Sequence, residues 1–435
     1  MTDLVVVGAG PFGLTVARLM AERGRQVTVV ERRDHIGGNA YSSPDPETGI
    51  EVHNYGAHIF HTANEQVWRF LGRFTAWTGY EHRVFTRHRG EVYPMPINLG
   101  TINQFFRSAL SPDQARQLIA RQTGAGAAKA AGRAPTDGQD AIDGENAAQA
   151  AGRGRGRGDR TASSTGENAA EAAGRGRGGG DRTATSTGSL RDKAISLIGR
   201  PLYEAFIEGY TAKQWQTAAD QLPASTINRL PVRYSYDSRY FSDPRQGLPA
   251  DGYAALWARL ADHPSVEVVL GHDFLDPLPD AVGGLSKDAC VGQVPVVFTG
   301  PIDRYFGYAA GPLGWRTLDF DWGHPATGDF QGCAVMNYAD LTEPWTRIIE
   351  FRHFHPERDY PSDQTVIARE FSRPAEVGDE PYYPINRPAD RSRLERYREL
   401  AAATGGIWFG GRLGRYQYLD MDMAVAAAIA LVAKL

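Results

Sequence analysis

The sequence predicts an α/β fold joined to an α+β part, and three observations carry this prediction. The chain begins with a strand, a glycine-rich turn, a helix and a second strand. Residues from about 230 to 380 alternate polar and apolar side chains between frequent Pro and Gly breaks, which is typical of antiparallel strands. Residues 401–435 return to a strand, a glycine turn and a final helix starting near Met421. One domain is therefore expected to use both ends of the chain.

The first turn has the pattern GxGxxG between a strand at 4–7 and a helix at 14–23. Gly8 permits the tight turn, and Gly10 lets the backbone approach a pyrophosphate. Gly13 lets the helix pack against the strand, while the helix N-terminus offers free N–H groups to an anion. The pattern in this context predicts a dinucleotide site.

The residues that follow favour FAD over a nicotinamide cofactor. Glu31 ends the second strand, 18 residues after Gly13, where a carboxylate can accept hydrogen bonds from a ribose. Gly37 and Gly38 come soon afterwards, and two adjacent glycines let the backbone pass close to a long ligand. A glycine pair by itself is equally compatible with an ordinary turn, so the interpretation depends on its place after the acidic strand end.

Composition limits the class of protein. The chain has 435 residues, 42% of them apolar, which is enough for a large core and more than one domain. A net charge of −4 gives no broad attraction to nucleic acid or membrane. Cys290 and Cys333 form no CxxC motif and are expected to be free thiols in a reducing compartment. The longest apolar run, 424–433, is too short to span a bilayer, and no signal peptide precedes the first strand, so we expect a cytoplasmic protein.

Three histidines, His53, His58 and His61, lie within nine residues. A metal site would need carboxylate or Cys ligands at a fixed spacing, which this stretch lacks. We interpret the histidines as neutral groups near a cofactor or as structural residues, and we predict no metal.

The segment 124–188 has a different composition, with a single Ile and no aromatic residue. It holds a tandem duplication with a period of 22 residues, because GENAA at 144–148 recurs at 166–170. Such a segment cannot bury enough apolar surface to offset its ordering entropy, so we predict a disordered, solvated insert. Its Gly-Arg runs allow RNA contact as an alternative, but acidic residues nearly balance them and no aromatic side chain is available for stacking.

The fold class is therefore α/β plus α+β, with four expected parts. These are a discontinuous Rossmann-type FAD-binding domain (1–85, 245–295 and 401–435), a helical subdomain (95–123 and 189–225), the low-complexity insert (124–188) and an antiparallel sheet substrate domain (226–244 and 296–400).

A succession of motifs covers nearly the whole chain outside the insert. They are YGAHIFH (55–61), YPMPIN (93–98), YTAKQW (210–215), LPA (222–224), RLPVR (229–233), FTGPID (298–303), TRIIE (346–350), GDEPYYP (378–384) and GGRL (410–413). Each is modest alone, but in this order they closely resemble bacterial UDP-galactopyranose mutase.

The resemblance implies an FAD isomerase that interconverts UDP-galactopyranose and UDP-galactofuranose without net redox change. In that family N5 of the reduced flavin attacks the anomeric carbon and UDP departs, so the cofactor replaces a nucleophilic side chain. The resemblance further implies an external reductant such as NAD(P)H, a homodimer, and a role in cell-surface glycan assembly. No nucleic-acid partner is expected.

The resemblance assigns Arg229, Arg347 and His58 as catalytic residues. The two arginines suit a departing diphosphate, because a guanidinium is always charged and can fork onto phosphate oxygens. Trp215 is expected to pack on the uracil. The other substrate residues implied are Phe206, Tyr210, Thr211, Tyr236, Tyr240, Asn337, Tyr383 and Tyr418. Each tyrosine is also compatible with a buried residue whose hydroxyl is satisfied.

On the flavin side, the resemblance places His58 beside the isoalloxazine, and Arg316 and Arg412 near flavin and substrate. Asp420 and Met421 start the last helix, whose N–H groups can steady the charge of a reduced flavin. The complete set of expected cofactor residues is Gly8, Gly10, Phe12, Gly13, Glu31, Arg32, Gly38, Asn39, Ala57, His58, Val268, Arg316, Arg412, Asp420 and Met421, with Val268 as a backbone contact to adenine.

Two other function classes are compatible with parts of the sequence. A flavin-dependent amine oxidase or desaturase accounts equally well for residues 8–31, but it gives no reason for Trp215 together with Arg229 and Arg347. A non-catalytic nucleotide-sugar or RNA-binding protein would make the insert its active part and would be indifferent to flavin reduction.

Overall fold

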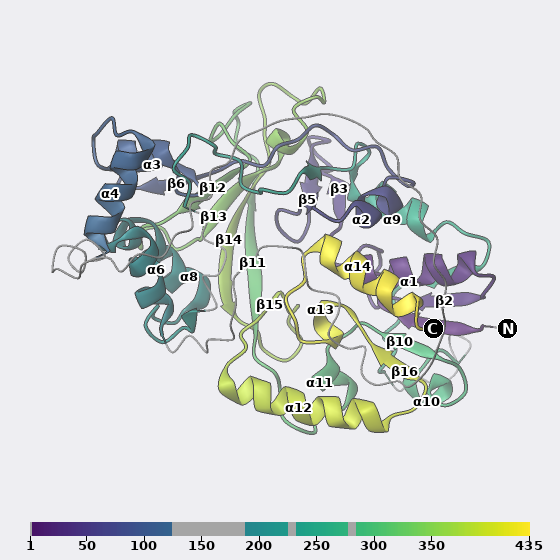
Figure 1. The fold of residues 1–435 in the computed structure, drawn as a ribbon. Helices are drawn as coiled ribbons and strands as arrows, with labels where there is room; N and C mark the ends of the chain where they lie inside the picture. The colour runs from purple at the N-terminus through teal and green to yellow at the C-terminus, as the bar shows by residue number, and fades with distance from the viewer. Residues whose placement is uncertain (1, 124–187, 225–231, 277–283) are drawn as a thin grey trace, which may run out of the picture.

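The computed structural model describes residues 2–123, 188–224, 232–276 and 284–435. A smaller sheet with its helices lies at one side of the molecule, a larger sheet lies near the centre, and a group of helices lies at the opposite end (Figure 1). Both termini lie beside the smaller sheet (Figure 1). The predicted insert, apart from Gly188, and the predicted catalytic Arg229 lie outside the described residues.

The smaller sheet in the described structure has five parallel strands in the order β16-β10-β1-β2-β9. They are β1 (Leu4–Val7), β2 (Val27–Val30), β9 (Val266–Val269), β10 (Val296–Phe298) and β16 (Ile407–Phe409). Every residue of β1, β2 and β10 is buried, which is typical of a parallel sheet covered on both faces. The predicted Rossmann-type start is confirmed, and the strand near the C-terminus completes the sheet that begins at residue 4.

Three helices from distant parts of the chain pack together beside this sheet. Helix α1 (Pro11–Glu22) starts with a proline at its first turn and packs against both α9 (Gly252–Ala261) and α14 (Met421–Val432). Figure 1 shows α1 and α14 side by side. Helix α14 starts at Met421, as the sequence predicts.

Strand β10 begins at Val296, one residue beyond the predicted segment 245–295. The cofactor segment must therefore run a few residues further if it is to include this strand. A short apolar run reads the same in a parallel and an antiparallel sheet, so the pattern alone does not tell which sheet it joins. The division into domains stays a prediction.

The larger sheet has seven strands in the described residues, in the order β15-β11-β14-β13-β12-β6-β7. They are β6 (Val84–His88), β7 (Glu91–Met95), β11 (Trp315–Gly323), β12 (Val335–Tyr338), β13 (Arg347–Glu350), β14 (Ile367–Pro374) and β15 (Tyr383–Pro384). Neighbours are antiparallel except β12 and β6, which are parallel. Within the range of about 230 to 380, the expected antiparallel strands are present as β11 to β14, but β9 and β10 belong to the parallel sheet. One hairpin, β6–β7, comes from earlier in the chain.

The helical group begins with capped helices. Asn98 and Ser111 form capping boxes at the starts of α3 and α4, and the Ser189 side chain accepts from a backbone N–H of α6. The group consists of α3 (Leu99–Phe105), α4 (Pro112–Gln122), α6 (Leu190–Ile198), α7 (Arg200–Tyr203), the π-helix η1 (Glu204–Glu208) and α8 (Gly209–Trp215).

The helical pattern at 190–210 is divided in the structure, which the sequence did not predict. Gly199 has a φ of 80° and interrupts the helix, and a Cβ there would lie 2.5 Å from Cβ of Gln122. The close approach of two helices therefore requires a glycine. The π-helix follows immediately, and such turns are frequent at functional sites.

The remaining elements connect these layers. They are β3 (Ser42–Pro44), β4 (Glu51–His53), β5 (Phe60–Thr62), β8 (Arg245–Gly247), α2 (Glu65–Leu71), α10 (Lys287–Cys290), α11 (Ile302–Tyr305), the 3₁₀ helix η3 (Phe351–Phe354), α12 (Pro388–Ala403) and α13 (Gly411–Gly414).

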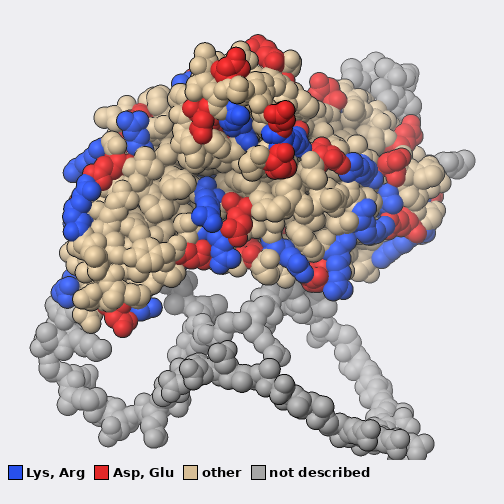
Figure 2. All heavy atoms as spheres, turned by 90° about the horizontal axis from the view of Figure 1, so that it is seen from above, with Lys and Arg blue, Asp and Glu red and all other residues tan. Residues whose placement is uncertain are grey.

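Both cysteines are buried and unpaired in the described structure. Within the described ranges, every helix is too short or too polar to cross a membrane. Acidic and basic side chains intermingle on the face shown in Figure 2.

Candidate functional site

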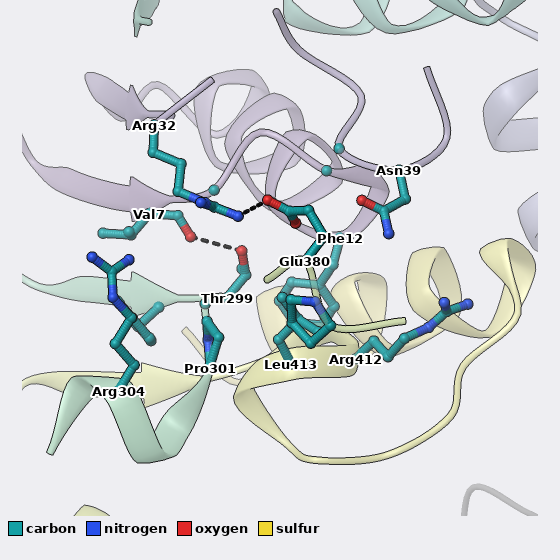
Figure 3. Close-up of a pocket in the computed structure, with 18 of the residues that line it drawn as sticks. Val7, Phe12, Arg32, Asn39, Thr299, Pro301, Arg304, Glu380, Arg412 and Leu413 are labelled. Atoms are coloured by element: carbon teal, nitrogen blue, oxygen red, sulfur yellow. Dashed lines mark hydrogen bonds and ion pairs between the residues drawn. The ribbon is translucent and has the colours of Figure 1, made fainter. Parts of the chain in front are cut away.

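A cavity of about 650 Å³ lies at the carboxyl ends of the parallel strands. Val7, Val30 and Phe298, the last residues of β1, β2 and β10, all line it. Ligands of open α/β sheets bind at this edge, and the volume is that of a small-molecule site. Figure 3 shows the cavity with residues of both ends of the chain in its wall.

The glycine-rich turn forms a cradle in which the backbone is exposed to the cavity. A Cβ at Gly8 would lie 2.1 Å from Oγ1 of Thr299, and a Cβ at Gly13 would lie 1.9 Å from the Gly8 carbonyl oxygen. At Gly38 it would lie 3.2 Å from Cα of Gly10. No room remains for side chains at the first two positions, while at Gly10 a Cβ would meet nothing within 4 Å. That open space is where a pyrophosphate can approach the chain.

Glu31 is held in place at the end of β2. Its side chain is 6% exposed, and its oxygens accept hydrogen bonds from the N–H of Ala9 at 2.7 Å and of Arg33 at 3.0 Å. A carboxylate has about four lone-pair sites, so it can still accept from a ribose.

A second carboxylate crosses the cavity from the loop after β14. Glu380 forms ion pairs with Arg32 and, at 2.6 Å, with Arg33. Arg33 also donates to Oδ1 of Asn39 at 2.6 Å. Figure 3 shows Arg32 pointing to Glu380, with Asn39 and Phe12 on the adjoining wall. These residues bring three distant segments to one end of the cavity.

One predicted cofactor residue, Val268, does not line the main cavity, and its contact to adenine stays a prediction. Val268, on the edge strand β9, lines a separate shallow hollow and is not among the described residues that line the main cavity. Residues 272–275, just past the end of β9, line the cavity and were missed by the sequence reasoning. Arg304, also missed, lines it and pairs with Asp273 at 2.7 Å. The signal available was the position after a parallel strand, where ligands bind.

His58 also lines the cavity, as a neutral imidazole. Burial lowers its pKa to about 4, with a smaller contribution from Arg412. Its Nδ1 lies 2.7 Å from the Gly56 carbonyl and must donate to it, which leaves Nε2 as an acceptor. The backbone N–H of His58 donates to Nδ1 of His53 at 3.0 Å, and Ala57 beside it is half-buried.

The start of α14 forms another part of the cavity wall. Asp420 and Met421 line it, so the positive end of the helix dipole faces the cavity. Arg412 also lines it and donates to the Leu419 carbonyl at 2.6 Å, and its guanidinium lies 4.9 Å from the ring centre of Tyr418. An anionic group bound here would meet both a helix N-terminus and a fixed cation.

Arg347, the first residue of β13, is the centre of a polar cluster on the larger sheet. It pairs with Glu370, on β14, at 3.0 Å and donates to the Tyr210 hydroxyl at 2.9 Å. Glu370 is 2% exposed and also accepts from Oγ1 of Thr346 at 3.0 Å. Burial alone would lower the pKa of Arg347, but Glu370 and the surrounding phenols raise it above its ordinary value.

Tyrosines surround this arginine and connect it to the cavity near Arg412. Burial raises the pKa of Tyr210, Tyr383 and Tyr418, so each phenol keeps the proton that it can donate. The rings of Tyr383 and Tyr418 stack with centres 6.0 Å apart. Because Arg412 lies over Tyr418, the cluster is continuous with the cavity wall. Tyr240 is one of the phenols that raise the pKa of Arg347.

The residues predicted to surround the nucleotide lie in different environments. Phe206 is buried, with its ring against Tyr93 at 5.0 Å, so its contacts are those of a core residue. Tyr236 is 70% exposed and its hydroxyl accepts from Asn103, which places it on the surface beside α3. Thr211 is buried within α8.

Trp215, Asn337 and Arg316 keep features that suit a ligand. Trp215 is half-buried at the end of α8. Asn337 lies opposite Arg347 in the sheet, and its buried Oδ1 has no hydrogen-bond partner among the described residues. Arg316 is 1% exposed, donates from two nitrogens to Oγ of Ser372, and has a pKa lowered to about 10 by burial. A buried acceptor without a partner costs free energy unless something binds it.

The glycine cradle, the acidic strand end and the cavity at the carboxyl ends of the parallel strands define a Rossmann-type dinucleotide-binding enzyme. A second polar cluster adjoins this cavity through Tyr418 and Arg412. A family model described as an NAD(P)-binding Rossmann-like domain matches residues 6–74, and one described as UDP-galactopyranose mutase matches residues 205–418.

The relatives agree with this class. A probable UDP-galactopyranose mutase of Klebsiella pneumoniae is 37% identical over 427 residues, covering 98% of this chain and 93% of that protein. A dTDP-fucopyranose mutase of Escherichia coli is 35% identical over 429 residues, covering 99% and 97%. A crystal structure of reduced UDP-galactopyranose mutase has a TM-score of 0.62 at 15% identity, covering 100% and 96%, which shows the same fold. The chain belongs to the UDP-galactopyranose mutase family, and it is an isomerase with a flavin cofactor.

Proposed function

We propose that the protein interconverts UDP-galactopyranose and UDP-galactofuranose while its FAD is reduced. The observation that carries this proposal is the cluster around Arg347, where a fixed guanidinium and neutral phenols adjoin the flavin end of a dinucleotide cavity. A guanidinium and phenol donors suit a diphosphate, and an oxidase acting on an amine has no use for them.

The residues that line the cavity suit a flavin dinucleotide. The turn at 8–13 would hold the pyrophosphate, Glu31 the adenosine ribose, and residues 272–275 the adenine end. His58, Arg412 and the start of α14 would border the ring system. A reduced flavin held by these residues would supply the nucleophilic chemistry, so no nucleophilic side chain would be needed.

The protein's own residues then bind and release the diphosphate. Arg347 stays charged because Glu370 compensates it, and it would hold the phosphate oxygens as negative charge develops on the departing UDP. Tyr210 and Tyr383 would donate their phenol protons in hydrogen bonds to the same group. Arg229 stays a prediction for the second arginine.

Product analysis tests this proposal directly. Purified protein is incubated with UDP-galactofuranose, with and without dithionite, and the nucleotide sugars are separated by chromatography. We expect UDP-galactopyranose to form with reduced flavin and not with oxidised flavin. Because one relative is a dTDP-fucopyranose mutase, dTDP-fucopyranose is tested in parallel, and faster turnover of that sugar would contradict the proposed substrate.

The proposal also includes the assembly and the supply of electrons. We propose NAD(P)H as the external reductant, a homodimer, and a cytoplasmic location. Oxygen uptake driven by a substrate, with no isomerised product, would instead support an oxidoreductase.

A further inference from the structure

Lys213, on α8, is a half-buried lysine whose ammonium group binds one loop of the larger sheet. Its Nζ donates to the backbone carbonyls of Tyr338 at 2.7 Å, Asp340 at 2.6 Å and Glu343 at 3.0 Å. An ammonium has three hydrogens to donate, and these three contacts use them all. The proposed mechanism gives this side chain no role.

The loop that Lys213 binds connects two strands that carry site residues. It begins at the end of β12, one residue after Asn337, and it ends at Arg347. Its far side is held as well, because the Asp340 carboxylate accepts from His88 and from the backbone N–H of Arg89, both at 2.6 Å. The loop is thus fixed between α8 and the β6–β7 hairpin.

Helix α8 meets the sheet with one face. Tyr210, which binds Arg347, lies three residues before Lys213 and so shares that face. One residue after the lysine, the Gln214 carbonyl accepts from Oγ of Ser372 at 2.8 Å. At the start of the helix, a Cβ at Gly209 would lie 2.3 Å from the Ala339 carbonyl oxygen, so the helix and the loop are in backbone contact.

We propose that Lys213 is a positioning residue for nucleotide binding. By binding three carbonyls of the loop 338–343, it fixes α8 against β12 and β13. This contact sets the distance between Tyr210 and Arg347, and it sets where Trp215 stands at the end of the helix. The lysine itself does not touch the substrate.

The inference rests on the proposed function, because the affected ligand is UDP. The test uses the FAD-loaded protein and the variants Lys213→Met and Lys213→Arg, with Lys193→Met as a matched control on the exposed face of α6. UDP affinity is measured by isothermal titration calorimetry, and KM, kcat, the flavin midpoint potential and the melting temperature are measured beside it.

We expect Lys213→Met to raise the Kd for UDP and the KM about tenfold, because a displaced Tyr210 and Arg347 would lose about one charge-assisted hydrogen bond to the ligand. The midpoint potential should stay at the wild-type value, because the flavin cavity lies on other elements. Lys213→Arg should recover part of the affinity, and Lys193→Met should match the wild type. In Gly209→Ala, the added Cβ would push α8 away from the same loop. This variant should therefore also weaken UDP binding and leave the midpoint potential unchanged.

Three results would overturn the inference. One is a UDP Kd unchanged in both Lys213→Met and Gly209→Ala. Another is a weakening of FAD binding and UDP binding, with a shifted midpoint potential, in proportion to a lowered melting temperature. That result would make the lysine merely structural. If the wild type itself binds no UDP, the proposed function fails, and the inference fails with it.

Discussion

At the scale of single residues, the site depends on how buried charges are compensated. Arg347 is held by Glu370, a carboxylate with almost no exposure to water, and together they keep a fixed cation beside neutral phenols. Removing a guanidinium partner from such a pair is costly, because the remaining charge stays buried. In the proposed function, this arrangement would give a bound diphosphate a rigid partner that needs no reorganisation during the reaction.

Replacing Arg347 by lysine tests this arrangement. The charge stays, but the fork that reaches both Glu370 and Tyr210 is lost. We expect kcat/KM to fall about 100-fold, the loss of roughly 3 kcal/mol of transition-state stabilisation. Steady-state kinetics with reduced enzyme measure it, with Arg398→Lys, in an exposed pair on α12, as the control. Equal activity in both variants would remove Arg347 from the mechanism.

At the scale of elements, the first turn separates two roles that glycine can have. Gly13 is required for packing, since a Cβ would lie 1.9 Å from the Gly8 carbonyl oxygen. Gly10 has an ordinary extended conformation, with φ −76° and ψ 179°, and free space on its Cβ side. One position thus serves the contact of strand and helix, and the other serves the approach of a ligand.

Two alanine variants are expected to behave differently for this reason. Gly13→Ala should lower the free energy of unfolding by about 2 kcal/mol or more, because it overpacks a buried contact. Gly10→Ala should melt like the wild-type apoprotein and bind FAD at least about tenfold more weakly. Thermal melting and FAD fluorescence titration distinguish them, and a Gly10→Ala protein that keeps full FAD affinity would contradict the proposed approach of the pyrophosphate.

At the scale of the whole molecule, buried histidines connect stability to pH. His53 and His82 are 1% and 4% exposed, and burial lowers the pKa of His53 well below its usual value and that of His82 to about 3. Below pH 6.5 the unfolded chain protonates these side chains and the folded chain does not. Their contribution to stability is therefore complete above pH 6.5 and is lost as the pH falls.

The expected result is a free energy of unfolding that decreases from pH 6.5 to pH 5. Each buried histidine contributes up to about 1.4 kcal/mol per pH unit in that window. Denaturant unfolding of the wild type and of His82→Gln measures the difference, and the variant should show a shallower dependence. Identical slopes would mean that His82 is protonated in the folded protein.

The low-complexity segment gives a second prediction at this scale. Helices α4 and α6, on either side of it, pack against each other and keep their own caps. We expect a protein in which a short linker replaces residues 126–186 to bind FAD and turn over substrate like the full chain. Loss of both activities would show that the segment has an active role.

Local sequence was sufficient where neighbours along the chain decide the structure. The GxGxxG turn with its flanking strands and helix, and the start of α14, were readable from glycine positions and local periodicity. The resemblance added a set of site residues from distant segments. Of these, Arg347, Tyr210, Tyr383, Tyr418 and Arg412 adjoin one another in the structure.

Only the tertiary structure decided the contacts between residues that are far apart in the chain. Four features have no local signal: the sheet that β10 joins, the helix break at Gly199, the lining of the cavity by residues 272–275, and the carbonyls around Lys213. Each depends on which surfaces meet after folding. The periodicity of apolar residues along the chain does not indicate which distant residue a side chain will contact. The sequence by itself determined the cofactor class, and the packing determined which side chains surround it.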